Sequence, residues 1–165
     1  MQDLLNTAEF TRYIVMDARR GDYGVVACTS QGQWVGTARV LYLPQQNPGY
    51  GFVAPGIGEL GVSVQPEARG VGLGTELICD VVEIARVRGD RGVSLSVETG
   101  NPARKLYEKL GFVDAGPNPV IALLCGQCQI EVYSSKKYLS LPVHFHTKTF
   151  RSSCIFSCSF RSVHQ

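Results

Sequence analysis

The sequence predicts an α/β (α+β) fold whose mixed central sheet is built around one β-α-β unit. A strand pattern at residues 59–64 is followed by a glycine-rich turn at 69–75 and then by a helical pattern. A second alternating strand, at 93–97, comes after that helix. Two strands joined through one helix at this spacing pair in parallel with a right-handed crossover. An apparent β-hairpin at residues 24–43 adds antiparallel strands, so the sheet is mixed.

The elements ahead of this unit are one helix and one hairpin. Residues 2–15 are predicted to form a short amphipathic helix, with Asn6 or Thr7 as caps for a later start. Residues 24–28 and 34–43 are rich in apolar residues and are separated by a tight polar turn. They are therefore predicted to be two antiparallel strands.

The turn after the central strand has the chemistry of a phosphate site. Pro66 ends strand pairing because it has no N–H, and a glycine-rich run at 69–75 leads into the helix. The first N–H groups of a helix lack partners within it and lie at its positive end. Thr75 and Leu77 stand where a dinucleotide fingerprint needs its third glycine, and the turn has no P-loop lysine. From these residues alone, a turn without a ligand also remains open.

The helix and strand that follow complete the unit. One side of the predicted helix carries Leu73, Leu77, Val81, Ile84 and Ala85. Gly89 to Gly92 then form a turn ahead of the second strand. Past that strand, Asn101 is a suitable N-cap with Pro102 at the first helical position, and Gly111 is a suitable C-cap glycine.

Two motifs in this region resemble the signatures of the GNAT superfamily of acetyl-CoA-dependent N-acetyltransferases. Residues 69–74 match Gln/Arg-x-x-Gly-x-Gly/Ala, and residues 101–112 match Asn-x5-Tyr-x3-Gly-Phe. Two signatures in this order, about one strand apart, are far more specific than either alone. The resemblance covers about residues 1–116 and implies the GNAT acyl-CoA N-acyltransferase fold.

The resemblance also implies an activity, the transfer of an acetyl group from acetyl-CoA to a primary amine by direct attack in a ternary complex. Backbone donors of the glycine loop would hold the pyrophosphate, and the central strand would bind the pantetheine arm. Asn101 is also explained as a plain N-cap. The residues implied to bind the cosubstrate are Val62, Ser63, Val64, Arg69, Gly70, Val71, Gly72, Leu73, Gly74, Thr75 and Asn101.

Two residues are candidates for proton transfer. Tyr107 shares a helical face with the apolar Ala103, Leu106 and Leu110, so its phenol should point inward and protonate the leaving thiolate. The alternative is a core aromatic residue. Glu59, at the start of the central strand, is the candidate general base. A solvated carboxylate, with a water chain as the base, is its alternative.

A long loop at residues 44–58 carries Tyr50 and Phe52. Loops of this length inside a small domain are more often functional than idle. We expect this one beside the start of the central strand, where the acceptor amine must enter. The alternative is that the two aromatic residues only attach the loop to the sheet.

The resembled fold opens with a strand and a helix that this sequence lacks ahead of residue 2. We therefore expect an abbreviated N-terminus and an open hairpin edge, which is an association hazard. Residues 121–165 could fill that edge, or the chain could be a truncated product.

Composition changes near residue 120. Residues 121–165 hold one of the 14 acidic residues, one of the 18 glycines, four of the six cysteines and all three histidines. We expect a GNAT domain at 1–120 and a separate Cys/Ser/His-rich tail at 121–165. Zinc ligands in that tail are a weaker alternative, because the spacing is loose. The candidates are Cys125, Cys128, His144, His146, Cys154 and Cys158.

The remaining expectations follow from charge and hydropathy. A net charge of +2 gives no argument for nucleic acid or an anionic membrane, and no apolar run approaches the length of a membrane span. We expect a cytoplasmic protein with reduced thiols, no bound metal, and a small-molecule or peptide amine as acceptor. A homodimer and an acyl-CoA-binding domain without turnover stay open.

Overall fold

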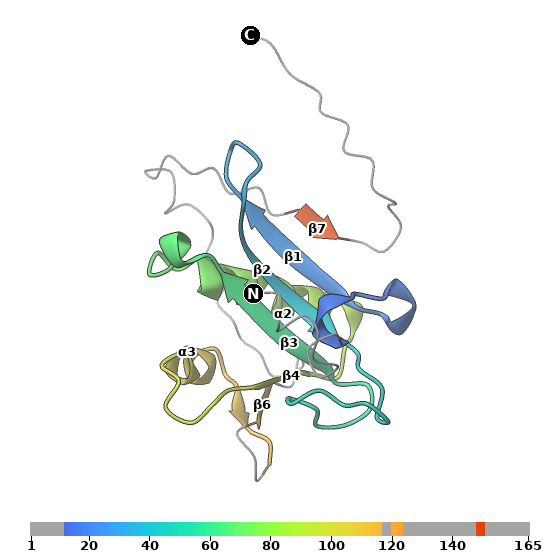
Figure 1. Ribbon diagram of the computed structural model, residues 1–165. Helices are drawn as coiled ribbons and strands as arrows, with labels where there is room; N and C mark the ends of the chain where they lie inside the picture. Colours follow the sequence, from blue (N-terminus) through green and yellow to red (C-terminus); the bar gives the residue numbers. More distant parts are fainter. Residues whose placement is uncertain (1–11, 117–119, 124–147, 151–165) are drawn as a thin grey trace.

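Seven strands form one mixed sheet of order β5-β6-β4-β3-β2-β1-β7 in the part of the chain that the computed structural model describes, residues 12–116, 120–123 and 148–150 (Figure 1). The strands are β1 (Tyr23–Cys28), β2 (Trp34–Leu41), β3 (Gly58–Val64), β4 (Val93–Ser96), β5 (Val113–Asp114), β6 (Val120–Leu123) and β7 (Lys148–Phe150). The helices are α2 (Leu73–Arg88) and α3 (Arg104–Lys109), with 3-10 turns η2 (Ala18–Arg20) and η3 (Pro66–Ala68). No helix in these ranges is long and apolar enough to cross a membrane.

The predicted hairpin is confirmed. β1 pairs antiparallel with β2, and β2 continues antiparallel with β3. The register between β1 and β2 shifts at Ala27 and Cys28, opposite the start of β2. β1, β2 and β3 therefore form the antiparallel part of the sheet, and β3 also belongs to the predicted parallel pair.

The predicted β-α-β unit is also confirmed, and its parallel pair is short. β3 and β4 pair only at Gly58 with Val93 and at Glu59 with Ser94. Beyond these positions the two strands diverge (Figure 1). The backbone of β3 from Leu60 to Val64 is thus left without a β4 partner on that side, as the resemblance implied.

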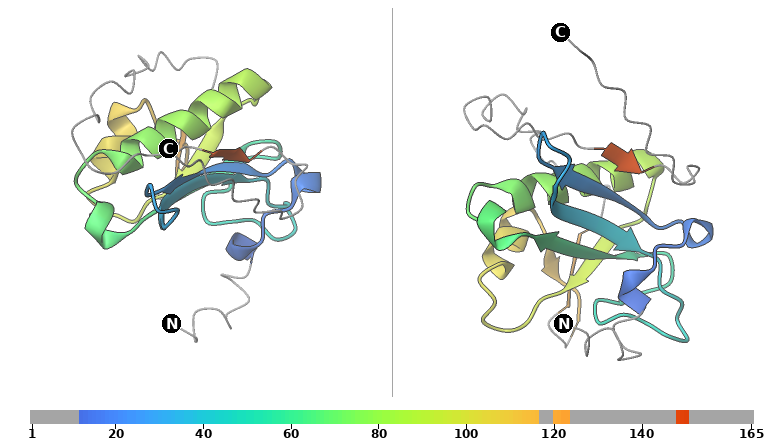
Figure 2. Two further views of the ribbon diagram at one scale, coloured as in Figure 1. Left: turned by 90° about the horizontal axis from the view of Figure 1, so that it is seen from above. Right: turned by 45° about the horizontal axis from the view of Figure 1, so that its top comes forward.

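Helix α2 lies along one face of the sheet (Figure 2). Its predicted apolar side is buried, and Gly36 of β2 allows close packing because a Cβ there would lie 3.0 Å from Leu77 Cδ1. Gly89, with φ 76°, ends the helix. The buried residues of the helix are Leu73, Leu77, Ile78, Val81, Val82 and Ala85.

Helix α3 begins later than predicted. The helix starts at Arg104, and Asn101 does not cap it; instead the Asn101 Oδ1 accepts from Ala103 N at 2.9 Å within a preceding turn. An asparagine ahead of proline makes such local turns readily. The predicted role of Gly111 is confirmed, since its φ is 90° and Phe112 N donates to Tyr107 O at 3.0 Å across the helix end.

The outer edge of the hairpin is covered. β7 pairs antiparallel with β1, with Gly24 opposite Phe150 and Val26 opposite Lys148. β6 pairs with β4 and β5. Strands β6 and β7 lie at or beyond residue 120. The proposed division of the chain into a domain and a tail at that residue remains a prediction. Most of the predicted helix at 2–15 and the zinc candidates lie outside the described residues, although residues 12–14 are helical.

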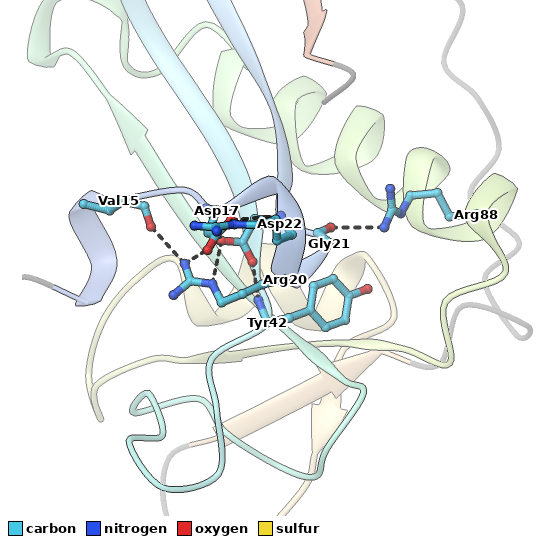
Figure 3. Close-up of polar contacts among 8 residues, drawn as sticks. Val15, Asp17, Arg20, Gly21, Asp22, Tyr42 and Arg88 are labelled. Carbon is cyan, nitrogen blue, oxygen red and sulfur yellow. Dashed lines mark hydrogen bonds and ion pairs between the residues drawn. The ribbon is translucent and has the colours of Figure 1, made fainter. Parts of the chain in front are cut away.

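A buried carboxylate joins the start of β1 to the end of β2 (Figure 3). The Asp22 side chain is fully buried and accepts from Asp17 N at 2.9 Å, Arg20 Nη2 at 2.6 Å and Tyr42 N at 2.8 Å. Arg20 also donates to Val15 O at 2.9 Å. One carboxylate therefore satisfies donors from three segments.

We predict that Asp22→Asn lowers the free energy of unfolding by about 3 to 5 kcal/mol, the usual loss when one member of a buried ion pair is removed. The amide would turn N–H groups toward donors that need an acceptor. Urea unfolding measures the loss. Arg19→Gln is the control, because that side chain is 93% exposed and its ion pair should contribute less than about 1 kcal/mol. Equal stabilities of the two variants would contradict the prediction.

Candidate functional site

The loop between β3 and α2 takes a shape that glycine permits. Pro66–Ala68 form one 3-10 turn, after which Gly70 and Gly72 have φ values of 77° and 91°. Residues with a Cβ rarely adopt these angles. The Arg69 side chain turns back, and its Nε donates to Val64 O at 3.0 Å. The two glycines thus lead the chain from the end of β3 into the first turn of α2.

The N-terminus of α2 is open to an anionic ligand. Gly72 is its N-cap residue, and no side chain caps the helix. A Cβ at Gly70 would meet nothing within 4 Å. The first amides of α2, at Leu73, Gly74 and Thr75, are those that a helix leaves without partners of its own. These residues fit the pyrophosphate of an acyl-CoA, which needs several backbone donors at a positive helix end.

The central strand leads into this loop. Val62 and Val64 are partly buried, and Ser63 between them is exposed. Because β4 has diverged, it does not pair with the β3 backbone at these positions, and apart from Val64 O, which accepts from Arg69 Nε, that side can bind an extended ligand as a further strand would. The resemblance assigns the pantetheine arm to this place.

Tyr107 packs from α3 against the core. Its ring meets Phe112 edge-on, with centroids 5.8 Å apart. Its hydroxyl forms no hydrogen bond to any residue in the described ranges, and burial raises the pKa of the phenol. The inward direction predicted for this side chain agrees with the packing. Its role as general acid stays a prediction.

Glu59 is buried rather than solvated, being only 7% exposed. Its Oε1 accepts from Gly51 N at 2.9 Å and from the Tyr13 hydroxyl at 3.1 Å. Its Oε2 is buried without a hydrogen-bond partner among the described residues. Burial raises the pKa of the Glu59 carboxyl, and this outweighs the lowering by Gly51, Tyr13 and the Arg12 charge.

The loop at 44–58 closes over Glu59. A Cβ at Gly49 would lie 1.7 Å from Glu59 Oε2, and one at Gly51 would lie 2.8 Å from the Leu95 carbonyl carbon. Both positions therefore require glycine. Tyr50 N donates to the Tyr13 hydroxyl at 2.7 Å, and the two rings stack at 6.2 Å. The loop contacts the start of β3, where the sequence predicted it.

The structure thus brings the predicted cosubstrate residues of β3, the loop and α2 into one continuous stretch. The sequence alone did not point to Tyr13, which fell within the predicted amphipathic helix at 2–15, or to Arg39. The glycines on either side of Tyr50 were the available signal for the enclosure of Glu59. In the described residues, no group of three or more metal-binding side chains comes together.

The chain belongs to the Acetyltransferase (GNAT) family, whose members use acetyl-CoA; the family matches residues 2–112. It is 34% identical over 110 residues to glucosamine 6-phosphate N-acetyltransferase of Trypanosoma brucei brucei, covering 66% of this chain and 71% of the relative. It is 36% identical over 91 residues to mycothiol acetyltransferase of Paenarthrobacter aurescens (strain TC1), covering 54% of this chain. The chain spans 27% of the length of that second relative.

A solved structure shows the same fold. Ribosomal-protein-alanine N-acetyltransferase from Brucella melitensis superimposes with a TM-score of 0.53 at 24% sequence identity, covering 74% of this chain and 88% of that chain. The GNAT fold inferred from the two motifs is therefore confirmed.

We predict that Gly72→Asp weakens acetyl-CoA binding by ~100-fold or more, because it adds a like charge at the pyrophosphate position. Isothermal titration calorimetry measures the affinity. Gly32→Asp is the matched control, since Gly32 has a φ of 79° in the hairpin turn and a Cβ there meets nothing within 4 Å. It imposes the same backbone strain away from the loop and should keep normal affinity. Normal affinity in the Gly72 variant would exclude the loop as the pyrophosphate site.

Proposed function

We propose that this chain is an acetyl-CoA-dependent N-acetyltransferase that acts by direct attack of an amine in a ternary complex. The observation that carries the proposal is the N-terminus of α2, which has no side-chain cap and follows the loop that contains Gly70 and Gly72. The pairing of β3 with β4 at only two positions supports it, because a cosubstrate can then lie along β3.

Each part of the site is proposed to bind one part of the cosubstrate. Backbone donors at 70–75 hold the pyrophosphate, Arg69 adds positive charge at its edge, and Asn101 contacts the cosubstrate from the turn before α3. The strand at Val62–Val64 orients the pantetheine arm. Acetyl-CoA supplies an acetyl group activated as a thioester. A β3 N–H directed at the thioester oxygen would stabilise the charge that develops there.

Glu59 is the proposed general base. The raised pKa of its carboxyl makes the carboxylate a better proton acceptor than an exposed glutamate. Gly49 encloses Oε2, so the proton reaches Glu59 by way of Oε1 and the Tyr13 hydroxyl. Burial and the neighbouring carboxylate raise the pKa of Tyr13 to about 12, which keeps this hydroxyl protonated and able to relay a proton.

The acceptor is proposed to be a small-molecule or peptide amine in the cytoplasm. The names of the relatives span both classes, an amino sugar phosphate and a ribosomal protein alanine. The deciding experiment follows release of coenzyme A thiol from acetyl-CoA with a panel of such amines, and mass spectrometry of the product. Acetylation of none of them would count against the proposed activity.

We predict that Glu59→Gln lowers kcat/KM by ~100-fold. In the wild type, kcat/KM should rise with pH as the Glu59 carboxyl loses its proton, and the variant should lack this rise. Because burial raises the pKa of this carboxyl, the lost rise should lie above the range of an exposed glutamate. Glu83→Gln is the control, since Glu83 pairs with Arg86 on the exposed side of α2. An unchanged pH profile in the Glu59 variant would leave a water chain as the base.

We predict that Tyr107→Phe lowers kcat by ~100-fold while the KM for acetyl-CoA changes little, because only the proton of the general acid is lost. The matched control is Tyr23→Phe. That hydroxyl donates to Asp90 at 2.9 Å, and its loss should cost about 1 kcal/mol of stability without slowing the reaction. A Tyr107→Phe enzyme with normal turnover would make Tyr107 a core residue only.

A further inference from the structure

The face of the sheet opposite α2 has a chemistry of its own. From Gly36 onward, even-numbered positions of β2 and β3 point to the helix, as the close approaches of Gly36 to Leu77 and of Gly74 to Val64 show. Odd-numbered positions therefore point the other way. Trp34 stands before this alternation, at the register shift between β1 and β2, and also lies on the face opposite α2. Glu59 lies on this second face, under the loop at 44–58. Arg39 and Gly61, which pair across β2 and β3, lie on the same face two residues further along.

Arg39 is a partly buried cation without a partner in the described residues. It forms no hydrogen bond and no ion pair there, and burial lowers the pKa of its guanidinium. Withdrawing a charge from water is costly unless another group compensates it. Other arginines of this region differ, since Arg20 is paired with Asp22 and Arg12 donates to Asn47. Arg39 is therefore the cation on this face that an incoming anion can satisfy.

A hollow of about 310 Å³ surrounds this side chain. The Arg39 side chain lies beside Gly61 of β3, since a Cβ built there would be in van der Waals contact with Arg39 Nε at 3.7 Å. Gly61 lies two positions after Glu59, a distance of about 7 Å along β3. The hollow is lined by Trp34, Thr37, Arg39, Gly61, Val62 and Ser63.

We propose that this hollow is the acceptor subsite and that Arg39 binds an anionic oxygen group, phosphate or carboxylate, of the acceptor amine. This proposal rests on the proposed acetyl transfer, and it names the substrate class as amines that also carry an anion. A guanidinium matches either group with two parallel N–H donors. Trp34, 41% exposed, lines the same hollow on the side of Arg39 away from Glu59 and adds a flat apolar wall there.

The first test compares two matched pairs of acceptors, glucosamine 6-phosphate with glucosamine, and γ-aminobutyrate with its amide. The wild-type protein should show a kcat/KM at least ~10-fold higher for the anionic member of a pair. A preference within the first pair identifies a phosphate acceptor, and within the second a carboxylate acceptor. Arg39→Gln should abolish the preference while activity on the neutral members is retained, and Arg39→Lys should restore part of it.

Arg86→Gln is the matched control, because it removes the same charge from an exposed ion pair on α2. It should leave the preference intact. Three results would overturn the proposal: no preference in the wild type, an equal loss on anionic and neutral amines in Arg39→Gln, or a raised KM for acetyl-CoA in that variant. The last would assign Arg39 to the cosubstrate.

A binding measurement separates this proposal from the proposed activity. Trp34 is the single tryptophan of the sequence and lines the hollow, so its fluorescence reports occupancy without any turnover. Titration with glucosamine 6-phosphate and with γ-aminobutyrate should change the emission of the wild type with at least one of the two, and that ligand should bind at least ~10-fold more weakly to Arg39→Gln. A response that depends on Arg39 supports the subsite even where no acetyl transfer occurs. Equal responses of both proteins, or none, would overturn it.

Discussion

The site depends on the short pairing between β3 and β4. Two paired positions anchor the parallel strands, and beyond them β3 keeps β2 on one side and pairs with no strand of the described residues on the other. Each unpaired backbone N–H and C=O along that stretch needs a partner. The fold therefore creates a binding edge inside the sheet, at the same end as the glycine loop. In the proposed site, the helix terminus, the strand edge and α3 can all reach one ligand because this pairing stops early.

A second constraint is the enclosure of Glu59. A carboxylate at 7% exposure with one unpartnered oxygen is costly to hold in its charged form. The surrounding loop is built to allow this burial, because Gly49 and Gly51 approach where no Cβ fits. The aromatic stack of Tyr13 on Tyr50 then closes the enclosure. The binding edge of β3 thus lies beside Glu59, whose carboxyl pKa is raised because the loop at 44–58 buries it.

The sequence was a good guide wherever the signal was local. The period of α2, the hairpin and the two motifs each follow from neighbouring residues, and these features were predicted correctly. Asn101 misled because asparagine ahead of proline stabilises a turn as readily as a helix start. The burial of Glu59 and the unpaired charge of Arg39 could not be predicted. Both depend on contacts between residues far apart in the chain, such as Tyr13 with Glu59 and Arg39 with Gly61.

The pairing of β7 with β1 has a consequence for how the molecule is made. Gly24 of β1 finds its partner in Phe150, so nearly the whole chain must be synthesised before that edge is closed. Contacts between such distant segments form slowly, because a long loop must be closed before they stabilise anything. Until then β1 presents unpaired backbone groups to neighbouring chains. The β7 segment of another copy offers the same hydrogen bonds, so nascent chains at high concentration would exchange this strand, a route to swapped dimers.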